Sequence, residues 1–294
     1  MKVIRIEDLK LIVPETSARG GIEYYEILEG KRGTPTNFSL LLATAHPGYF
    51  SPRHRHNFEQ VRLVTDGIPM SYGDIGDADV GSVGWFPEGT MYGPLSSDGR
   101  SQALQLQYGG PSKQGYMSFE EYREHFDVLR KDGTFEKGVY TWYDENKVKH
   151  NKDGYEAVWQ HWAGRKLEYP PARYRSGCLM YPERFRLIRD RPGVSYRHMG
   201  HFGWPATSLD MIQLEAGAEL ELQERSIYFV RFGSGKSPTA WSRFSTIYLE
   251  QGESGRIETD EPTELFHIGL PNFDLIGTEM TLMPHDRVKE TQPA

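Results

Sequence analysis

The sequence contains a single cysteine, Cys178, among its 294 residues. No intrachain disulfide can therefore form, and a metal site made of several thiolates is disfavoured. A lone cysteine usually serves as a small buried hydrophobic side chain, and a catalytic thiol is the alternative role for Cys178.

Long apolar runs and an excess of positive charge are also missing. No stretch approaches the roughly 20 apolar residues that span a bilayer, and the N-terminal segment lacks the apolar core of a signal peptide. The 34 basic and 41 acidic residues leave a net charge of -7, so no positive field would attract nucleic acid. We therefore expect a cytoplasmic protein that binds a small molecule rather than nucleic acid or a membrane, and assembly into a homo-oligomer stays open.

Most of the sequence that is present has the pattern of β-strands. Short apolar or alternating runs, separated by Gly, Pro and Asp, fill the first and the last third of the chain. The middle differs, because Ser118 and Glu121 have the spacing of a capping box and predict the start of a helix. A second short helix is expected around residues 155–162, within an otherwise irregular, aromatic connector.

The two strand-rich thirds have similar turn patterns. The string QVRLVTDG at 60–67 matches SIYFVRFG at 226–233, and both end in a glycine. A second alignment sets His267 opposite Tyr92, because each residue lies five positions after a proline. These matches indicate a duplicated domain whose copies have diverged.

One stretch has the spacing of a known motif. Gly48 is followed by His54, His56, Gln60 and Gly67, and this series resembles the first motif of the cupin superfamily, with Gln60 in place of its glutamate. Residues two apart on a strand project from the same face, so the two histidines would share the interior of a barrel. The resemblance implies a cupin barrel in the first third of the chain.

The second cupin motif also has a counterpart. Gly81, Pro87 and Gly89 match it, while Tyr92 stands where the family has a histidine and Ser96 where it has an asparagine. Together the two motifs agree at seven of their ten marked positions. This agreement, with the internal duplication, predicts a bicupin.

The predicted fold class is therefore all-β with minor α-helix, in the form of tandem antiparallel barrels. We expect an N-terminal cupin barrel at 1–112, a helical and irregular connector at 113–176, and a C-terminal degenerate cupin barrel at 177–294. The tryptophans and tyrosines of the connector either cover the first barrel or join the two barrels, and packing is their expected role.

A metal site is one interpretation of the histidine pair. His54 and His56 suit a divalent transition metal, iron first and otherwise manganese, nickel or zinc, but two imidazoles alone seldom hold such an ion against water. Gln60 or Tyr92 would have to complete the shell, since Glu59 should face outward by strand alternation. The alternative is that both histidines remain as hydrogen-bonding core residues without a metal.

The tripeptide His54-Arg55-His56, followed by Arg62, is similar to a stretch of the gentisate and hydroxynaphthoate ring-cleaving dioxygenases. The resemblance covers these residues alone. It implies oxidative chemistry on a small anionic or aromatic molecule, with Arg62 binding an acidic group. An arginine on an edge strand is the plainer alternative. Gln105 and Gln107 lie on one face of a later strand and are expected to face the same interior.

The last third is expected to be largely structural. Its histidine positions fall within the string AELELQERS, which contains glutamates and leucines, and only His267 occupies a ligand-like place. His198 and His201 lie in a segment rich in Gly and Pro, which predicts a loop.

Three functions follow from these residues. The first is a metal-dependent, dioxygenase-like oxidoreductase with His54, His56 and Gln60 as ligands and with Arg62 and Tyr92 as catalytic residues. The second is a metal-free barrel that binds or senses a small molecule. The third is a metal-independent isomerase or lyase in which a histidine works with Tyr92 as acid and base.

Overall fold

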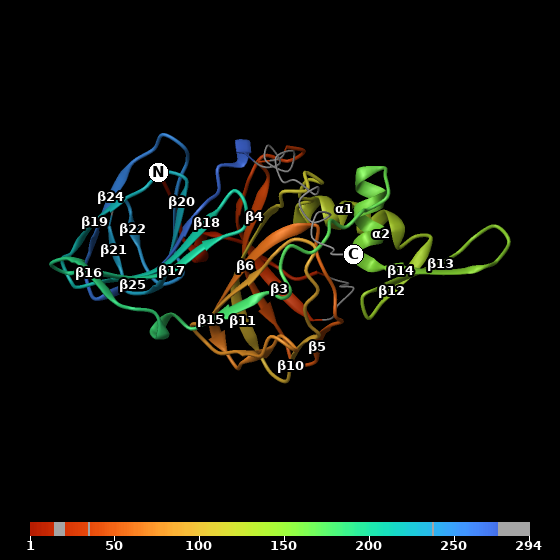
Figure 1. Ribbon diagram of the computed structural model, residues 1–294, viewed down its shortest axis with the longest axis horizontal. Coiled ribbons are helices and arrows are strands. Elements are labelled where there is room, and N and C mark those ends of the chain that lie inside the picture. Colours follow the sequence, from red (N-terminus) through yellow and green to blue (C-terminus); the bar gives the residue numbers. More distant parts are fainter. Residues whose placement is uncertain (15–20, 35, 237, 276–294) are drawn as a thin grey trace, which may run out of the picture.

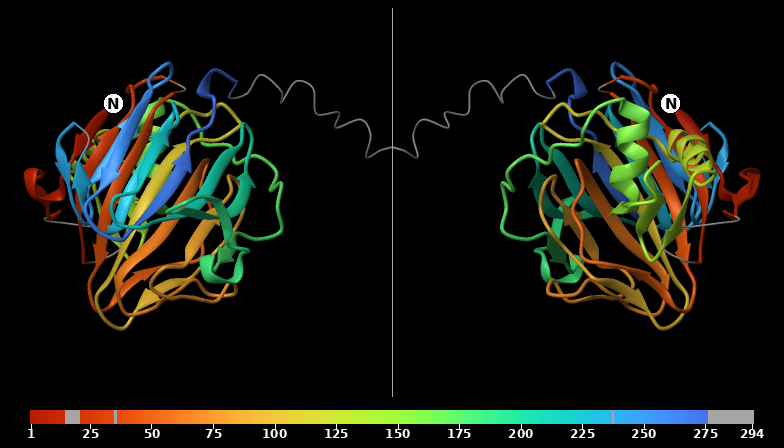
Figure 2. Two further views of the ribbon diagram at one scale, coloured as in Figure 1. Left: turned by 90° about the vertical axis from the view of Figure 1, so that its left-hand side faces the viewer. Right: turned by 90° about the vertical axis from the view of Figure 1, so that its right-hand side faces the viewer.

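The computed structural model describes residues 1–14, 21–34, 36–236 and 238–275, which form two β-barrels and a small cap (Figure 1). The first barrel lies in the middle of the molecule, with the second barrel on one side and the cap on the other (Figures 1 and 2). Within these ranges no helix is long and apolar enough to cross a membrane.

The first barrel consists of a seven-stranded and a four-stranded sheet, both antiparallel. Its strands are β2 (Leu11–Ile12), β3 (Ile22–Glu29), β4 (Phe38–Ala45), β5 (Tyr49–Ser51), β6 (Phe58–Gly67), β7 (Met70–Ser71), β8 (Asp77–Ala78), β9 (Val83–Phe86), β10 (Leu95–Ser97), β11 (Ser101–Gly109) and β15 (Cys178–Met180). The larger sheet has the order β15-β9-β6-β11-β4-β3-β2, and the smaller has the order β5-β10-β7-β8. The central strands β6 and β11 therefore hold the middle of the large sheet.

The second barrel repeats this arrangement strand by strand. Its strands are β1 (Lys2–Ile4), β16 (Ile188–Arg191), β17 (Val194–Phe202), β18 (Thr207–Leu214), β19 (Glu219–Leu222), β20 (Ser226–Phe232), β21 (Gly235–Lys236), β22 (Ala240–Trp241), β23 (Thr246–Leu249), β24 (Gly255–Thr259) and β25 (Thr263–Gly269). Their orders, β1-β23-β20-β25-β18-β17-β16 and β19-β24-β21-β22, place β20 where β6 lies in the first barrel. The sequence had predicted this pair of equivalent strands.

Two strands cross the boundaries expected from the sequence. β1 pairs with β23 of the second barrel, and β15 pairs with β9 of the first. Each barrel thus receives one edge strand from the segment that precedes the other barrel. The barrel limits of 1–112 and 177–294 therefore divide the chain differently from the sheets, because strands of three residues carry too little pattern to show their partners.

The cap contains α1 (Phe119–Leu129), α2 (Gly154–Ala163) and a three-stranded sheet of β12 (Gly133–Glu136), β13 (Val139–Tyr143) and β14 (Lys149–Asp153). Ser118 and Glu121 form the predicted capping box, with the Glu121 amide donating to Ser118 Oγ at 3.3 Å. The expectation of an irregular connector missed the small sheet. The outer strands β12 and β14 carry few apolar residues, so they show no apolar alternation, and only β13 has a strand-like composition. The short helices Ile6–Asp8, Pro182–Arg184 and Phe273–Leu275 complete the described elements.

The largest apolar cluster lies where the two large sheets face each other. It combines residues of the first barrel with residues of the second: Val61, Leu63, Trp85, Leu104 and Leu106 with Met211, Ile227, Phe229, Phe266 and Ile268. These side chains point out of their own barrels and bury one another. A separate apolar cluster fills the second barrel and includes Leu220 and Leu222, which lie in the string where the cupin motif has its histidines.

His267 does not correspond to Tyr92. It lies opposite Tyr228 on β20, and the residue opposite Arg62 at the matching place on β6 is Gln105. The true counterpart of β9 is β23, one strand earlier than the alignment assumed. The equal spacing from a proline was therefore coincidental.

Candidate functional site

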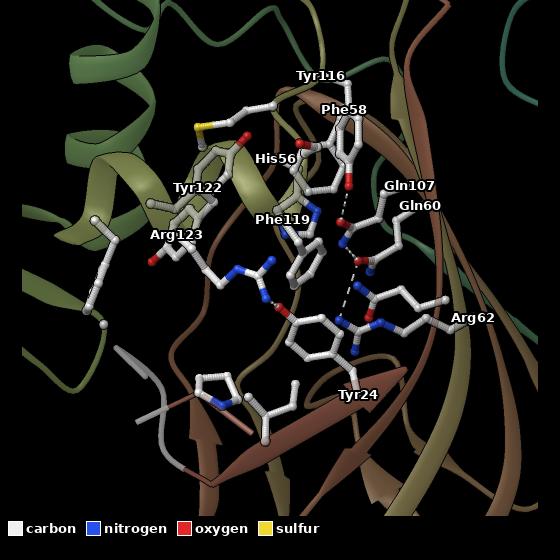
Figure 3. Close-up of a pocket in the computed structure, with 18 of the residues that line it drawn as sticks. Tyr24, His56, Phe58, Gln60, Arg62, Gln107, Tyr116, Phe119, Tyr122 and Arg123 are labelled. Atoms are coloured by element: carbon white, nitrogen blue, oxygen red, sulfur yellow. Dashed lines mark hydrogen bonds between the residues drawn. The ribbon is translucent and has the colours of Figure 1, made fainter. Parts of the chain in front are cut away.

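The first barrel encloses a cavity of about 410 Å³ between its large sheet and α1 (Figure 3). Strand β6 contributes Phe58, Gln60 and Arg62, because residues two apart on a strand share one face. The register of β6 with β11 sets Gln107 opposite Gln60 and Gln105 opposite Arg62. Four polar side chains thus lie side by side on one wall of the cavity.

Aromatic rings form much of the remaining wall, and several come from the cap. The rings that line the cavity belong to Tyr24, Tyr49, Phe58, Tyr116, Phe119, Tyr122, Phe126 and Tyr155. Phe58 packs edge-on against Tyr116 and Tyr155, with ring centroids 5.4 and 5.8 Å away. Tyr122 on α1 stacks on Tyr155 of α2 at 6.4 Å. A ligand in this cavity would meet flat apolar faces on one side and amides with a guanidinium on the other.

A directed chain of hydrogen bonds crosses the polar wall. Tyr116 Oη donates to Gln107 Oε1 at 3.0 Å, and Gln107 Nε2 donates to Gln60 Oε1 at 2.6 Å. Arg62 Nη2 lies 3.4 Å from the same Gln60 oxygen. Because a guanidinium can only donate, the Gln60 atom that faces it is the oxygen. The Gln60 nitrogen is then left to donate to Tyr92 Oη, 3.3 Å away.

Tyr92 lies between the two motif histidines. Its Oη is 3.1 Å from the Nε2 atom of His54 and 3.1 Å from that of His56. His54 Nδ1 lies 2.6 Å from the Pro52 carbonyl, which can only accept, so the proton of neutral His54 sits on Nδ1. Tyr92 therefore donates its one proton to His54 Nε2 and accepts hydrogen bonds from Gln60 and His56.

The structure brings the five predicted site residues into one network, but not all of them reach the cavity. His56, Gln60 and Arg62 line it, whereas His54 and Tyr92 lie behind His56. All five are buried, with Arg62 the most exposed at 9%. Tyr92, predicted from the sequence as a catalytic residue, is not among the residues that line the cavity. Instead its ring packs on Phe86 in the apolar cluster of the barrel, and only its hydroxyl joins the polar network.

Comparison with known proteins gives the fold a name. No family model matches the sequence, and no curated protein matches it either. Among solved structures, a candidate dioxygenase from Nostoc punctiforme superposes with a TM-score of 0.61 at 9% identity, covering 92% of this chain and 83% of that one. A mutant of the oxalate decarboxylase of Bacillus subtilis gives 0.52 at 11% identity, over 92% and 77% of the two chains. A 7S globulin from Momordica charantia gives 0.50 at 12% identity, over 91% and 83%.

The chain has the two-barrel cupin fold. At these identities the likeness establishes the architecture alone, and the matches include a globulin as well as an enzyme. One fold can carry many unrelated functions, so the activity has to be argued from the site.

The donor set of this cupin site meets only part of what a divalent metal ion needs. Ligands about 2.1 Å from one ion lie about 3.0 Å apart when they are at right angles, so the 3.1 Å spacings around Tyr92 Oη leave room for an ion. Gln60 offers no oxygen there, because its Oε1 already receives two donors. In the described ranges no group of three His, Cys, Asp or Glu side chains is placed to hold a metal. Unless Tyr92 ionises, the shell stops at two imidazoles, and a resident ion does not fit.

The Arg62 guanidinium in this cupin cavity has no anionic partner among the described residues. Its guanidinium carbon lies 5.7 Å from the ring centroids of Tyr72 and Phe86, and its Nε is buried without an acceptor. Among the residues that the structure describes, no carboxylate forms an ion pair with it. Burial lowers the pKa of Arg62, but the hydroxyl groups of Tyr72, Tyr92 and Tyr49 raise it on balance. The cation therefore has tyrosine and amide oxygens around it but no anionic partner among the described residues.

The burial of Glu59 was not predicted from the sequence. Glu59 points away from the first cupin barrel as expected, yet it is only 2% exposed because the second barrel covers it, with Gly203 beside its carboxyl group. Trp85 Nε1 donates to it at 3.0 Å. Burial, with a smaller contribution from Glu88, raises the pKa of Glu59 to about 8. Burial likewise raises the pKa of Glu88 to about 7, although Ser112 donates two hydrogen bonds to that carboxyl group.

The second cupin barrel holds a polar cluster of His198, Asp210, Ser226 and His267. From the sequence, His198 was predicted to lie in a loop. His198 lies on β17 rather than in a loop, and its Nδ1 is 2.7 Å from Asp210 Oδ1. His267 Nδ1 is 2.9 Å from the other oxygen of Asp210, and its Nε2 is 3.1 Å from Ser226 Oγ. Gly200 interrupts the apolar pattern at a register shift, which explains the predicted loop. Asp210 thus joins the exposed His198 to the buried His267 and Ser226.

Proposed function

We propose that the first barrel binds a small organic anion with a flat, apolar body and acts on it as a metal-independent acid–base enzyme of the isomerase or lyase type. The observation that carries this proposal is Arg62, a buried guanidinium on the wall of an aromatic cavity with no carboxylate partner in the described residues.

Binding of an anion would remove the electrostatic penalty at Arg62. Breaking or omitting one partner of a buried ion pair typically costs about 3–5 kcal/mol, and a ligand carboxylate would supply the missing partner through two parallel hydrogen bonds. The tyrosine and phenylalanine rings opposite Arg62 favour a flat apolar body. A neutral ligand of the same shape would leave the cation unpaired.

Proton transfer is assigned to His56, supported by Tyr92 and His54. Of His54, His56 and Tyr92, only His56 lines the cavity, so it exchanges the proton with the ligand. Tyr92 Oη connects His56 Nε2 to His54 Nε2, and the Pro52 carbonyl holds His54 through Nδ1. A proton taken up at His56 can therefore be passed through Tyr92 Oη to His54 Nε2, where the resulting imidazolium keeps a hydrogen bond at each nitrogen.

A metal-dependent, dioxygenase-like oxidoreductase is the second candidate. The observation in its favour is that His54 Nε2, His56 Nε2 and Tyr92 Oη converge at spacings that ligands of one ion would have. It requires Tyr92 to bind as a phenolate, and iron would be the first ion to measure in protein purified without a histidine tag.

Phenylpyruvate tests the proposal, because it combines an aromatic ring, a carboxylate and an exchangeable methylene. We expect it to bind, as measured by calorimetry, and to exchange its methylene protons with D₂O faster than in buffer, as measured by NMR. Arg62→Gln should weaken binding, because the cation is lost. Tyr92→Phe should keep binding and lose the exchange. Binding without enzyme-dependent exchange would remove the enzyme from the proposal, and absence of binding would refute it altogether.

A further inference from the structure

A second guanidinium faces the same cavity, from the cap. Arg123 on α1 lines the cavity opposite the sheet that carries Arg62, and its Nη1 donates to Tyr24 Oη at 3.0 Å (Figure 3). Burial raises the pKa of Tyr24 to about 12, so this partner is a neutral phenol and does not balance the charge. In the described part of the chain no carboxylate lies within ion-pair distance of Arg123.

The acidic residues around this second guanidinium are engaged elsewhere. Asp127, one turn along α1, pairs with Arg130 at 3.2 Å. Glu29 on β3 accepts two hydrogen bonds from Arg32, at 2.8 and 2.9 Å. Burial, together with the charge of Glu29, raises the pKa of Glu26, although the charges of Arg123 and Arg32 lower it. The cavity therefore presents two guanidinium groups, one on the sheet and one on the cap, that have no carboxylate at ion-pair distance in the described residues.

From this arrangement we infer that the natural ligand of the first barrel is a dianion: a flat molecule with two acidic groups, one bound by Arg62 and the other by Arg123. This inference rests on the proposed function and adds the second acidic group. The first group lies on the sheet wall and the second under α1, so the ligand spans the cavity between barrel and cap (Figure 3). Each guanidinium can give a carboxylate two parallel hydrogen bonds.

Benzoate, isophthalate and terephthalate separate one acidic group from two on the same ring. We expect calorimetry to show at least one of the two dicarboxylates binding the wild-type protein about tenfold or more tightly than benzoate, because a second charge-assisted contact is made. Arg123→Gln should remove this preference and leave benzoate affinity unchanged. Arg62→Gln should weaken all three ligands.

Arg130→Gln is the matched control, since Arg130 is the C-cap residue of the same helix and lines the cavity but is paired with Asp127. It should leave the dicarboxylate preference intact. Arg123→Lys keeps the charge and should keep part of the preference, which guards against an effect of altered folding. A dicarboxylate preference that survives Arg123→Gln, or no preference in the wild type while benzoate binds, would overturn the dianion inference and leave the proposed function standing. Failure of benzoate and both dicarboxylates to bind would contradict both.

Discussion

Replacement of Glu59 by glutamine should change how the stability of the protein depends on pH. Glu59 is buried between the barrels, receives a hydrogen bond from Trp85, and lies near Glu88. Its pKa is raised from 4.5 to about 8, so the folded protein holds a proton on this group that the unfolded chain releases. Stability from this group is fully present below pH 4.5 and is lost as the pH rises through about 8.

The size of the effect follows from the same shift. At about 1.4 kcal/mol per pH unit, a rise in pKa from 4.5 to about 8 corresponds to a loss of up to about 5 kcal/mol across that range. Glutamine has the same shape and remains neutral, so the Glu59→Gln protein should lose much less free energy of unfolding as the pH rises. The other groups titrate in both proteins, so the difference between the two curves reports Glu59 together with its interaction with Glu88.

Urea unfolding followed by tryptophan fluorescence, at several values between about pH 5 and pH 9, measures that difference. We expect the wild-type protein to lose several kcal/mol relative to Glu59→Gln between the two ends. Glu183→Gln is the control, because the Glu183 side chain is 68% exposed, and its curve should follow the wild type. A difference curve for Glu59→Gln that stays flat across this range would refute the argument that Glu59 is buried and protonated.

Three further outcomes test the network and the cap. Tyr92→His would place a third imidazole beside His54 and His56, so the purified protein should gain iron or nickel by elemental analysis, and no gain would contradict the convergence of the histidines. Tyr92→Phe removes the hydroxyl that three buried groups share, and should lower the free energy of unfolding by about 1–3 kcal/mol in urea titrations, whereas an unchanged value would argue against the shared contact. Ser118→Ala removes the capping box of α1 at a cost of about 1 kcal/mol. Its helix amides should exchange faster while those of β6 do not, and equal exchange in both would contradict the cap assignment.

The fold could be predicted because its signals are local and repeated. Glycines that end hairpins, alternating strands and the paired strings ending at Gly67 and Gly233 recur at matching places, and the sheet orders agree with them. Both glycines have a φ of +95°, in the region that disfavours other residues. That the two histidines meet could be predicted from the motif, but their setting could not. His54 and His56 lie between β5 and β6 rather than on a strand, and only His56 lines the cavity.

The cavity and the burial of charges could not be predicted in the same way. Glu59 and Gln60 are adjacent on β6 and project from opposite faces of the sheet. The sequence does not show that the second barrel covers the face of Glu59. The sequence also does not show that Arg62 lacks a carboxylate partner, because that depends on all of its neighbours in space. The cap residue Arg123 reaches the cavity through a helix about 60 residues further along the chain, and no local pattern reports such a contact.

The most direct test of the central claim is the affinity of benzoate and its neutral analogue benzamide for the wild-type protein and for Arg62→Gln, by calorimetry at neutral pH. If a buried, unpaired Arg62 selects anions, the wild-type protein should bind benzoate at least about tenfold more tightly than benzamide, since a charge-assisted hydrogen bond contributes about 1.5–3 kcal/mol. Arg62→Gln should lose most of this preference and keep only what Arg123 provides. A preference for benzoate that is undiminished in Arg62→Gln, or equal binding of both ligands by the wild type, would contradict the account.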